Sequence, residues 1–244
     1  MRRKNDNNTE FDHFQELSNE WWNPNGKFKV LHTLTPLRIK YLIDNINLAS
    51  KNKPKNNKIL KGLEILDLGS GGGLVCEPLA RLGANVTGID FIKKNIKTAV
   101  DHSKKSDLNI TYLNQDLLSL KLNKKYDIIL MLEIIEHINN WENVVNRILQ
   151  FLKPEGKIIF STINRTLLSR IFAIFVAEEI LKWVPKNTHN FSKLVRIKEL
   201  TSFLKKNNME ILDITGLVFN PISKEWFLNK DMTKINYFCT AQKI

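Results

Sequence analysis

A cluster of glycines at the end of an apolar segment is the feature that most limits what this 244-residue chain can fold into. The apolar segment runs from Leu63 to Leu68, the cluster Asp67-Leu68-Gly69-Ser70-Gly71-Gly72-Gly73 follows, and apolar residues resume with helical spacing from Leu74 to Leu82. Residues without a Cβ atom let the backbone approach a ligand closely. The segment therefore predicts a strand, a tight ligand-binding loop and a helix.

The same alternation of strands and helices continues through most of the chain. Short β-branched and apolar runs indicate strands, and segments with apolar residues every three or four positions indicate helices. The expected strands are Asn85 to Ile89, Ile110 to Leu113, Tyr126 to Leu132 and Lys157 to Ile163; the expected helices are Lys93 to Lys104, Trp141 to Leu152 and Ile197 to Lys206. Alternation of this kind predicts a doubly wound α/β fold, with helices on both faces of a mostly parallel sheet.

The last strands of the chain distinguish between two groups of doubly wound proteins, those that bind S-adenosylmethionine (SAM) and those that bind a nicotinamide dinucleotide. Strands are expected at Met209 to Gly216 and Asn236 to Ala241, and the segment Leu217 to Ile235 between them shows no crossover helix. A hairpin there makes the last of seven strands antiparallel, which is the arrangement of class I SAM-dependent methyltransferases. The glycines at 69, 71 and 73 also depart from the G-x-G-x-x-G pattern of nicotinamide-binding proteins.

The chain divides by composition into a small number of parts. Residues 1–10 are basic and Asn-rich and are expected to be disordered, residues 11–58 to form an N-terminal helical cap and linker, and residues 59–244 to form the methyltransferase domain. Within that domain, residues 165–190 interrupt the alternation as an inserted segment. No internal repeat is seen.

Composition favours a cytoplasmic globular protein with a sizeable core, since 43% of residues are hydrophobic and 25% are charged. No stretch reaches the roughly 18 uninterrupted apolar residues of a membrane span. The two cysteines match no metal or redox spacing. A net charge of +12 attracts phosphates on nucleic acid or on anionic lipid, but no arginine-rich block interleaved with aromatic residues is present, so we expect no nucleic-acid partner.

Polar residues follow the expected strands at the edge where a ligand would lie. Asp90 ends the second strand about twenty residues beyond Gly69, where a carboxylate can accept hydrogen bonds from ribose hydroxyls. Gln115 and Asp116 follow the third strand. Two interpretations are open for them: contact with the adenine ring of the cofactor, or an ordinary helix N-cap. Leu132 ends the fourth strand and is expected to line the methionine part of the cofactor.

Glu133, Glu136 and His137 follow the fourth strand directly. If this segment turns helically, the three side chains fall on one side at i, i+3 and i+4 and have the oxygen and nitrogen ligands to hold Mg²⁺ or another divalent cation. The alternative is a purely structural role. Spacing alone leaves both open.

The inserted segment contains Leu167 to Ala177, which is too apolar for a helix exposed to water. It is flanked by Arg165, Arg170, Lys182 and Lys186, and an apolar face bordered by cations is typical of a helix that lies on an anionic membrane. A lid packed over the active site is the other interpretation.

From about Phe11 to the C-terminus the chain resembles the ubiquinone biosynthesis O-methyltransferases. The glycine cluster is generic, whereas the matching motifs from Leu132 onward are specific to that family. Apart from the cluster, the matching motifs are Trp21-Trp22-Asn23, Pro36-Leu37-Arg38, Thr87-Gly88-Ile89-Asp90, Leu132-Glu133-Ile134-Ile135-Glu136-His137, Phe160-Ser161-Thr162-Ile163-Asn164-Arg165, Val184-Pro185-Lys186-Asn187-Thr188-His189 and Asn220-Pro221-Ile222. Two mild departures are Ser70, where many members have cysteine, and Leu132, which is often methionine.

The resemblance implies methyl transfer from SAM to a phenolic oxygen of 2-polyprenyl-6-hydroxyphenol and of 3-demethylubiquinol. It implies cofactor contacts at Arg38, Gly69, Asp90 and Leu132, and a place on the inner face of the membrane, with other ubiquinone-biosynthesis proteins as further partners. Eukaryotic relatives are thought to need a divalent metal at positions equivalent to Glu133, Glu136 and His137.

Two further matters stay open from the sequence. The phenol proton can pass to His137 or to His189, or a metal can lower the phenol pKa instead. Alternative functions are methyl transfer to another small molecule or to RNA, and a non-catalytic SAM-binding membrane scaffold; binding to RNA would depend strongly on salt concentration.

Overall fold

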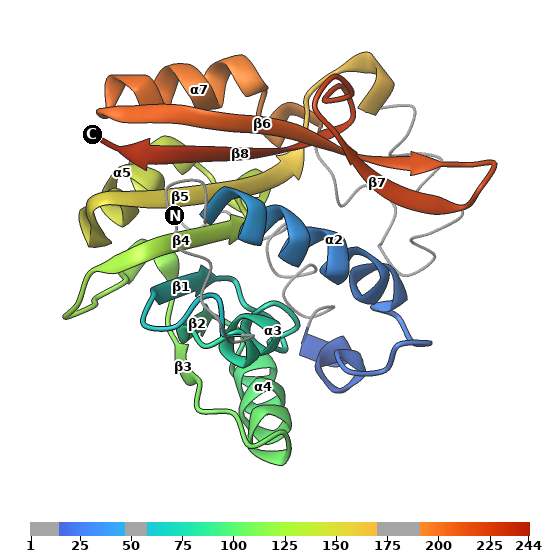
Figure 1. Ribbon diagram of the computed structural model, residues 1–244, viewed down its shortest axis with the longest axis vertical. Coiled ribbons are helices and arrows are strands. Elements are labelled where there is room, and N and C mark those ends of the chain that lie inside the picture. Colours follow the sequence, from blue (N-terminus) through green and yellow to red (C-terminus); the bar gives the residue numbers. More distant parts are fainter. Residues whose placement is uncertain (1–14, 47–57, 170–190) are drawn as a thin grey trace, which may run out of the picture.

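A computed structural model of the chain describes residues 15–46, 58–169 and 191–244. They form one eight-stranded sheet with helices on both faces, in the strand order β3-β2-β1-β4-β5-β8-β6-β7 (Figure 1). The strands are β1 Glu64–Leu68, β2 Asn85–Asp90, β3 Thr111–Asn114, β4 Tyr126–Leu132, β5 Leu152–Ile163, β6 Met209–Asn220, β7 Glu225–Asn229 and β8 Asn236–Lys243. The main helices are α2 Lys29–Ile46, α3 Cys76–Arg81, α4 Lys93–Lys105, α5 Trp141–Ile148 and α7 Ile197–Lys206.

The doubly wound arrangement predicted from the sequence is confirmed. Strands β1 to β5 pair in parallel, and β8 lies antiparallel between β5 and β6. The sheet has one strand more than predicted, because β6 continues to Asn220 and β7 then pairs back against it. The mixed polar and apolar residues of this hairpin lack the continuous apolar character of the buried strands, so the sequence pattern concealed it.

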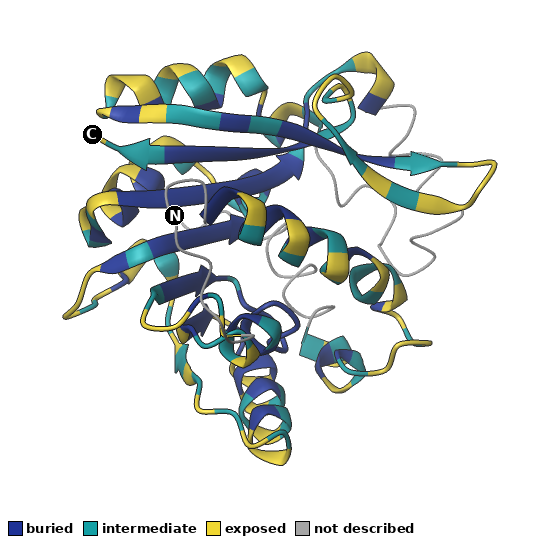
Figure 2. Ribbon diagram, viewed as in Figure 1, coloured by how far each residue is buried: buried dark blue, intermediate teal, exposed yellow. Residues whose placement is uncertain are grey.

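Two apolar layers enclose the sheet, whose central strands are buried (Figure 2). On one face, Leu42 of α2 and Leu79 of α3 are fully buried in a cluster with residues of β1, β4 and β5. On the other, Val145 of α5 and Leu204 of α7 are fully buried against residues of the same strands. Helix α4 packs against β2 and β3. Because helices cover both faces of the sheet, the sequences of its strands are continuous apolar runs.

Helix α2 is fastened to the sheet by two polar contacts at its C-terminal half. The Nζ atom of Lys157 in β5 donates to the carbonyl oxygens of Asn45 and Ile46 at 2.7 and 3.2 Å. A cation is favourable there because the last carbonyls of a helix lack partners within the helix. The hydroxyls of Tyr41 and Thr240 are 2.9 Å apart. These contacts hold α2 so that its earlier residue Arg38 reaches the carboxyl ends of the strands.

Several predicted features lie outside the described residues: the disordered N-terminus, the linker at 47–57, His189 and most of the inserted segment. The inserted segment is described only up to Ser169, where a helical turn begins at Leu167. In the part of the chain that the structure describes, no helix is long and apolar enough to cross a membrane.

Candidate active site

The glycine cluster forms a sharp loop between β1 and α3. Gly69, Gly71 and Gly73 have φ angles of 69°, 54° and 90°, a backbone region in which other residues are strained. The N–H groups of Gly69 and Ser70 donate to the carbonyl oxygen of Ile89 at 2.7 and 2.9 Å. The loop is thereby held against the end of β2, and the tight turn that the sequence predicted is confirmed.

Asp90 joins this loop from the end of β2. Its carboxylate accepts hydrogen bonds from the N–H of Gly71 at 3.0 Å, the N–H of Ile92 at 2.8 Å and the side-chain amide of Asn95 at 3.4 Å. Burial raises the pKa of Asp90 to about 6, against the opposing effect of these hydrogen bonds. A carboxylate has about four lone-pair directions, so one remains for a ligand hydroxyl.

Arg38 brings a positive charge to the other side of the loop. Its Nη2 atom is 3.6 Å from the Oε1 atom of Glu133, which also accepts a hydrogen bond from the hydroxyl of Ser161 at 2.7 Å. Burial raises the pKa of Asp67 to about 7, and the nearby Arg38 opposes that rise. Arg38 is therefore the shared counter-charge of two carboxyl groups from β1 and the end of β4.

Two buried polar atoms at this place have no hydrogen-bond partner among the described residues. They are the Nε atom of Arg38 and the hydroxyl oxygen of Ser70 in the glycine loop. Buried polar groups without a partner are rare in folded proteins and commonly mark a bound ligand or water. Together with the bare backbone of the loop and the carboxylate of Asp90, they fit a polar ligand such as a nucleoside with a charged side group.

The predicted helical grouping of Glu133, Glu136 and His137 is not formed. Only Ile135–His137 make a single 3-10 turn, whereas Glu133 precedes it with a φ of 54° and turns instead toward Arg38. Over residues 15–46, 58–169 and 191–244, no three His, Cys, Asp or Glu side chains are grouped so that they could hold a metal ion. A metal role for these residues stays a prediction.

Glu136 is nevertheless unusual, because it is buried with one carboxylate oxygen unpartnered within the described structure. Burial raises its pKa, and the negative charge of Glu133 raises it further. His137, which is half-buried, lowers it. This carboxyl group is thus held near the active-site edge of β4 in an environment that favours its protonated form.

The remaining predicted residues have separate outcomes. Leu132 lies at the end of β4, half-buried and in register with Ser161 of β5. The carboxylate of Asp116 accepts a hydrogen bond from the N–H of Leu118 at 2.9 Å, so it caps a short 3-10 turn, which is the second of the two interpretations given above.

Two neighbouring tryptophans were assigned no role from the sequence, although they contact the loop directly. The indole N–H of Trp22 donates to the carbonyl oxygen of Gly72 at 2.8 Å. A Cβ atom placed on Gly72 would lie 2.4 Å from the side chain of Trp21. A pair of large aromatic residues before a helix start was the available signal, but the sequence alone did not show which surface they cover.

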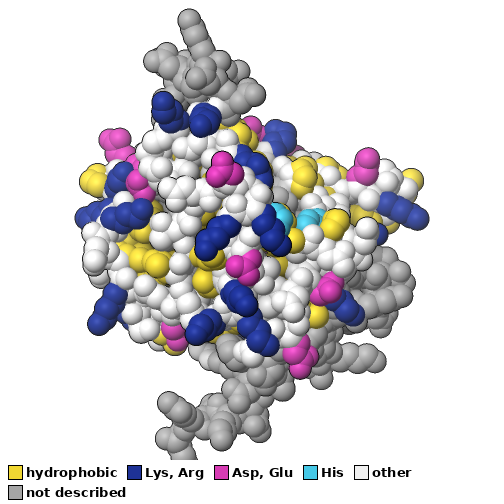
Figure 3. Space-filling model, turned by 90° about the horizontal axis from the view of Figure 1, so that it is seen from below, with side chains coloured by type: hydrophobic (Ala, Val, Ile, Leu, Met, Phe, Trp, Pro, Cys, Tyr) yellow, Lys and Arg dark blue, Asp and Glu magenta, His cyan; other side chains and the backbone are white. Residues whose placement is uncertain are grey.

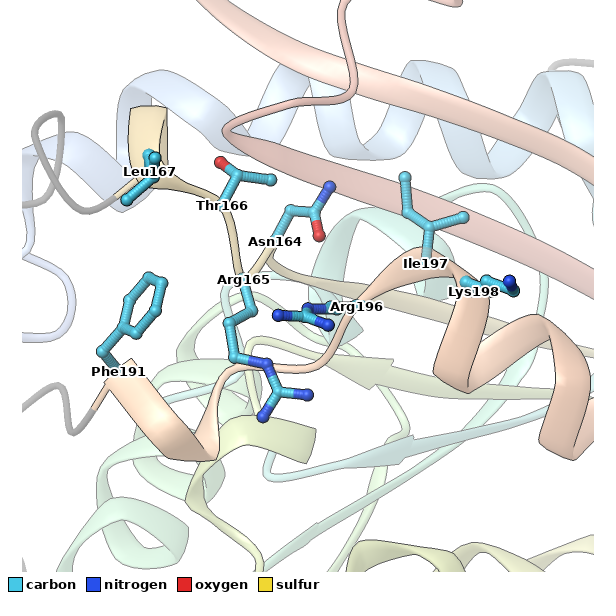
Figure 4. A pocket seen from close by; sticks show the side chains of 8 residues that line it. All are labelled: Asn164, Arg165, Thr166, Leu167, Phe191, Arg196, Ile197 and Lys198. Carbon is cyan, nitrogen blue, oxygen red and sulfur yellow. The ribbon is translucent and has the colours of Figure 1, made fainter.

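A cavity of about 480 Å³ opens at the carboxyl end of β5 (Figure 4). It combines cationic and apolar side chains, and its lining residues are Asn164, Arg165, Thr166, Leu167, Phe191, Arg196, Ile197 and Lys198. Arg165 is fixed by an ion pair with Glu199 and by a hydrogen bond of 3.1 Å to the carbonyl oxygen of Ser192. The cavity lies at the same edge of the sheet as Asp90 and Glu133.

Known proteins resemble the chain over nearly its whole length. Residues 34–214 match the family model of a methyltransferase domain. A ubiquinone biosynthesis O-methyltransferase of Rickettsia prowazekii is 44% identical over 97% of this chain and 91% of its own length. One of Pelagibacter ubique is 43% identical over 95% of both.

Solved structures agree in fold at lower sequence identity. The magnesium protoporphyrin IX methyltransferase of Synechocystis, determined with bound SAM, has a TM-score of 0.68 at 16% identity and covers both chains completely. The plantazolicin methyltransferase BpumL in complex with SAH has a TM-score of 0.60 at 17% identity over 97% of each chain.

We predict that Gly72→Ala destabilises the protein by about 1–3 kcal/mol, the usual cost of overpacking. Gly72 does not have a positive φ, so the effect comes from the collision with Trp21 alone. Urea unfolding measures it, and Trp21→Leu in the same chain is expected to relieve most of it. If the losses of unfolding free energy caused by Gly72→Ala and by Trp21→Leu simply add in the double variant, Trp21 does not lie against Gly72.

Proposed function

Because the chain belongs to the family of ubiquinone biosynthesis O-methyltransferases, we propose that it transfers a methyl group from SAM to a phenolic oxygen of a polyprenylated phenol or quinol. It is a SAM-dependent methyltransferase of class I fold. The proposed acceptors are 2-polyprenyl-6-hydroxyphenol and 3-demethylubiquinol. The observation that carries the proposal is identity of 40–44% with five such enzymes over nearly the entire chain.

SAM supplies an activated methyl group on a sulfonium centre, and the residues around the glycine loop hold it. We assign Asp90 to one ribose hydroxyl and the loop at Gly69 to a close backbone approach. Arg38, with its unpartnered Nε atom, is assigned to the charged amino-acid end, near Leu132. These assignments use the carboxylate of Asp90 and the unpartnered Nε atom of Arg38.

On the acceptor side, the protein has to align a phenol oxygen with the methyl carbon and remove the phenol proton. We propose that the acceptor enters from the cavity at the end of β5, whose apolar side chains suit a polyprenylated ring. His137 remains our proton acceptor, because it follows the active-site end of β4 and an imidazole can take up a proton near neutral pH. His189 is kept as the second candidate.

We propose a divalent cation such as Mg²⁺ as a second cofactor beside SAM. The ligand types are present in Glu133, Glu136 and His137, but Glu133 pairs with Arg38 instead. Binding a cation there requires that ion pair to open, which makes the metal requirement a property to be measured.

We further propose that the enzyme works at an anionic membrane surface on the cytoplasmic side, where its polyprenylated acceptor resides. Leu167 and Leu168, at the start of the inserted segment, are 75% and 50% exposed and adjoin the cationic cavity. Figure 3 shows cations spread over one face among acidic side chains, an arrangement that favours general attraction to a surface over a groove for RNA. We propose other proteins of ubiquinone synthesis as further partners.

The first test is methyl transfer from labelled SAM to a short-chain demethylubiquinol, with chelator and then with added Mg²⁺ or Zn²⁺. We expect turnover, since family and site agree. Turnover lost to chelator and restored by metal supports the metal site, and turnover indifferent to chelator removes it. SAM binding without turnover on quinol would indicate another acceptor or a scaffold role, and salt-sensitive binding of RNA would indicate the RNA alternative.

We predict that the affinity for SAM falls as the pH is lowered through about 6. In the proposed site the carboxylate of Asp90 accepts a hydrogen bond from the ribose, and burial raises the pKa of Asp90 in the free protein to about 6. The affinity should therefore be complete above that pH and decline below it by up to about tenfold per pH unit. Calorimetric titration between pH 5 and pH 8 is the measurement.

Asp90→Asn should weaken binding about tenfold or more at pH 8 and remove the decline near pH 6. If the affinity of this variant for SAM still declines near pH 7, we assign that decline to protonation of Asp67, whose pKa burial raises to about 7. Asp116→Asn is the control, because Asp116 only caps an exposed turn. Equal affinity of wild type and Asp90→Asn at pH 8 would remove Asp90 from the site.

Membrane contact is tested with anionic and neutral vesicles. The double substitution Leu167→Glu and Leu168→Glu should lower binding to anionic vesicles about tenfold, because two apolar side chains are lost from the contact. Binding of SAM should be unchanged. Ile244→Glu is the matched control, since Ile244 is 84% exposed beyond the opposite end of β8. An equal loss in both variants would mean that general charge, and not this segment, governs the binding.

A further inference from the structure

One face of helix α4 is occupied by the segment that precedes α2. We call residues 17–28 the N-terminal strap; it begins with the 3-10 turn Leu17–Glu20, which lies beside α4 (Figure 1). Asn95, Thr98 and His102 of α4 are spaced by three and four residues and so share one side of the helix. All three contact the strap.

Asn95 makes the most buried of these contacts. Its Oδ1 atom accepts a hydrogen bond from the indole N–H of Trp21 at 2.9 Å. The hydroxyl of Ser18 also lies 2.9 Å from this Oδ1 atom and shares its single proton between it and the carbonyl oxygen of Gln15. Further along α4, the hydroxyl of Thr98 donates to the carbonyl oxygen of Ser18 at 2.9 Å. The ring of His102 stacks on Trp22, with centroids 3.5 Å apart and an angle of 3° between the planes.

The opposite side of the strap lies on the glycine loop. The ring of Trp21 covers Gly71 and Gly72, where added Cβ atoms would come within 2.4 Å of it, and it stacks on Phe28 at 4.0 Å. Trp22 donates to the carbonyl oxygen of Gly72 at 2.8 Å. The strap is therefore held between α4 and the loop that receives the cofactor.

The side chain of Asn95 also faces the cofactor-binding carboxylate. Its Nδ2 atom donates to Oδ1 of Asp90 at 3.4 Å, and Oδ2 of Asp90 accepts from the N–H of Gly71 at 3.0 Å. The chemistry of the partners fixes the orientation of this amide, because the indole N–H can only donate and an ionised carboxylate can only accept. Asn95 is 2% exposed, so no water competes for these bonds.

We propose that Asn95 is a positioning residue that couples docking of the N-terminal strap to occupation of Asp90 by the cofactor ribose. A cofactor bound to Asp90 keeps that carboxylate ionised and fixed, which holds the Asn95 amide with its oxygen toward Ser18 and Trp21. The strap then closes more firmly over Gly71 and Gly72. Linkage makes the effect reciprocal, so a docked strap strengthens cofactor binding by the same factor.

This inference rests on the assignment of Asp90 to the cofactor, but not on the identity of the methyl acceptor. Two quantities are measured on the full chain without acceptor: the affinity for SAM by calorimetry, and hydrogen exchange of the strap amides with and without SAM. In the wild type, SAM should slow exchange of residues 17–28 at least severalfold. In Asn95→Ala, the affinity should fall about tenfold and SAM should no longer slow that exchange.

Two milder variants test the same contacts in case Asn95→Ala does not fold. Trp21→Phe keeps a ring over the loop but removes the indole donor, and Ser18→Ala removes the hydroxyl donor. Each should reduce the protection of the strap by SAM, and neither should have a further effect when combined with Asn95→Ala. Thr98→Val is the matched control: it loosens the strap on the same side of α4 without touching the contact to Asp90, so SAM should still slow exchange.

Three results would overturn the proposal. The first is a wild-type strap whose exchange SAM does not change. The second is an Asn95→Ala variant in which SAM slows strap exchange as much as in the wild type, whatever its affinity, since Asn95 then has only a structural role. If Asp90→Asn binds SAM normally, the site assignment fails, and the proposal fails with it; acceptor turnover reports separately on the proposed function.

Discussion

The hydrogen bond from the N–H of Gly71 to the carboxylate of Asp90 is the contact on which the rest of the site depends. It joins the loop after β1 to the end of β2, two neighbouring parallel strands whose carboxyl ends meet at one edge of the sheet. Parallel pairing alone places these ends close together, but only a loop free of side chains can turn inward to meet the carboxylate. Fold and ligand site are thus consequences of the same few residues.

Charge at this edge is arranged around a small number of buried groups. Arg38 comes from a helix outside the alternating pattern and faces carboxyl groups of β1 and of the segment after β4. It reaches them because Lys157 fixes the end of its helix to β5. Arg38 balances these two carboxyl groups, and its unpartnered Nε atom leaves one buried donor for a further hydrogen-bond acceptor.

Much of the fold follows from the sequence, because its strands are buried on both faces and its glycines stand where the backbone needs them. Asp90 and the loop were predictable together for the same reason. The arrangement of Glu133, Glu136 and His137 was not predictable. Glu133 has a positive φ, which turns its side chain toward Arg38, and no local sequence pattern encodes that conformation. Likewise, Asn95 looks like an ordinary polar position of a surface helix until the strap is placed against it. Contacts between residues far apart in sequence are what the pattern leaves out.

That distance in sequence has a consequence for the order in which the molecule can be completed during synthesis. The hydroxyls of Tyr41 and Thr240 meet across 199 residues, and Ser18 meets Asn95 across 77. A ribosome adding about 5–20 residues per second needs roughly 4–15 s to make α4 after Ser18, and several times longer to reach β8. The contact between α2 and β8 through Tyr41 and Thr240 therefore forms only after β8 has been made, whereas Leu42 of α2 can already pack against β1, β4 and β5.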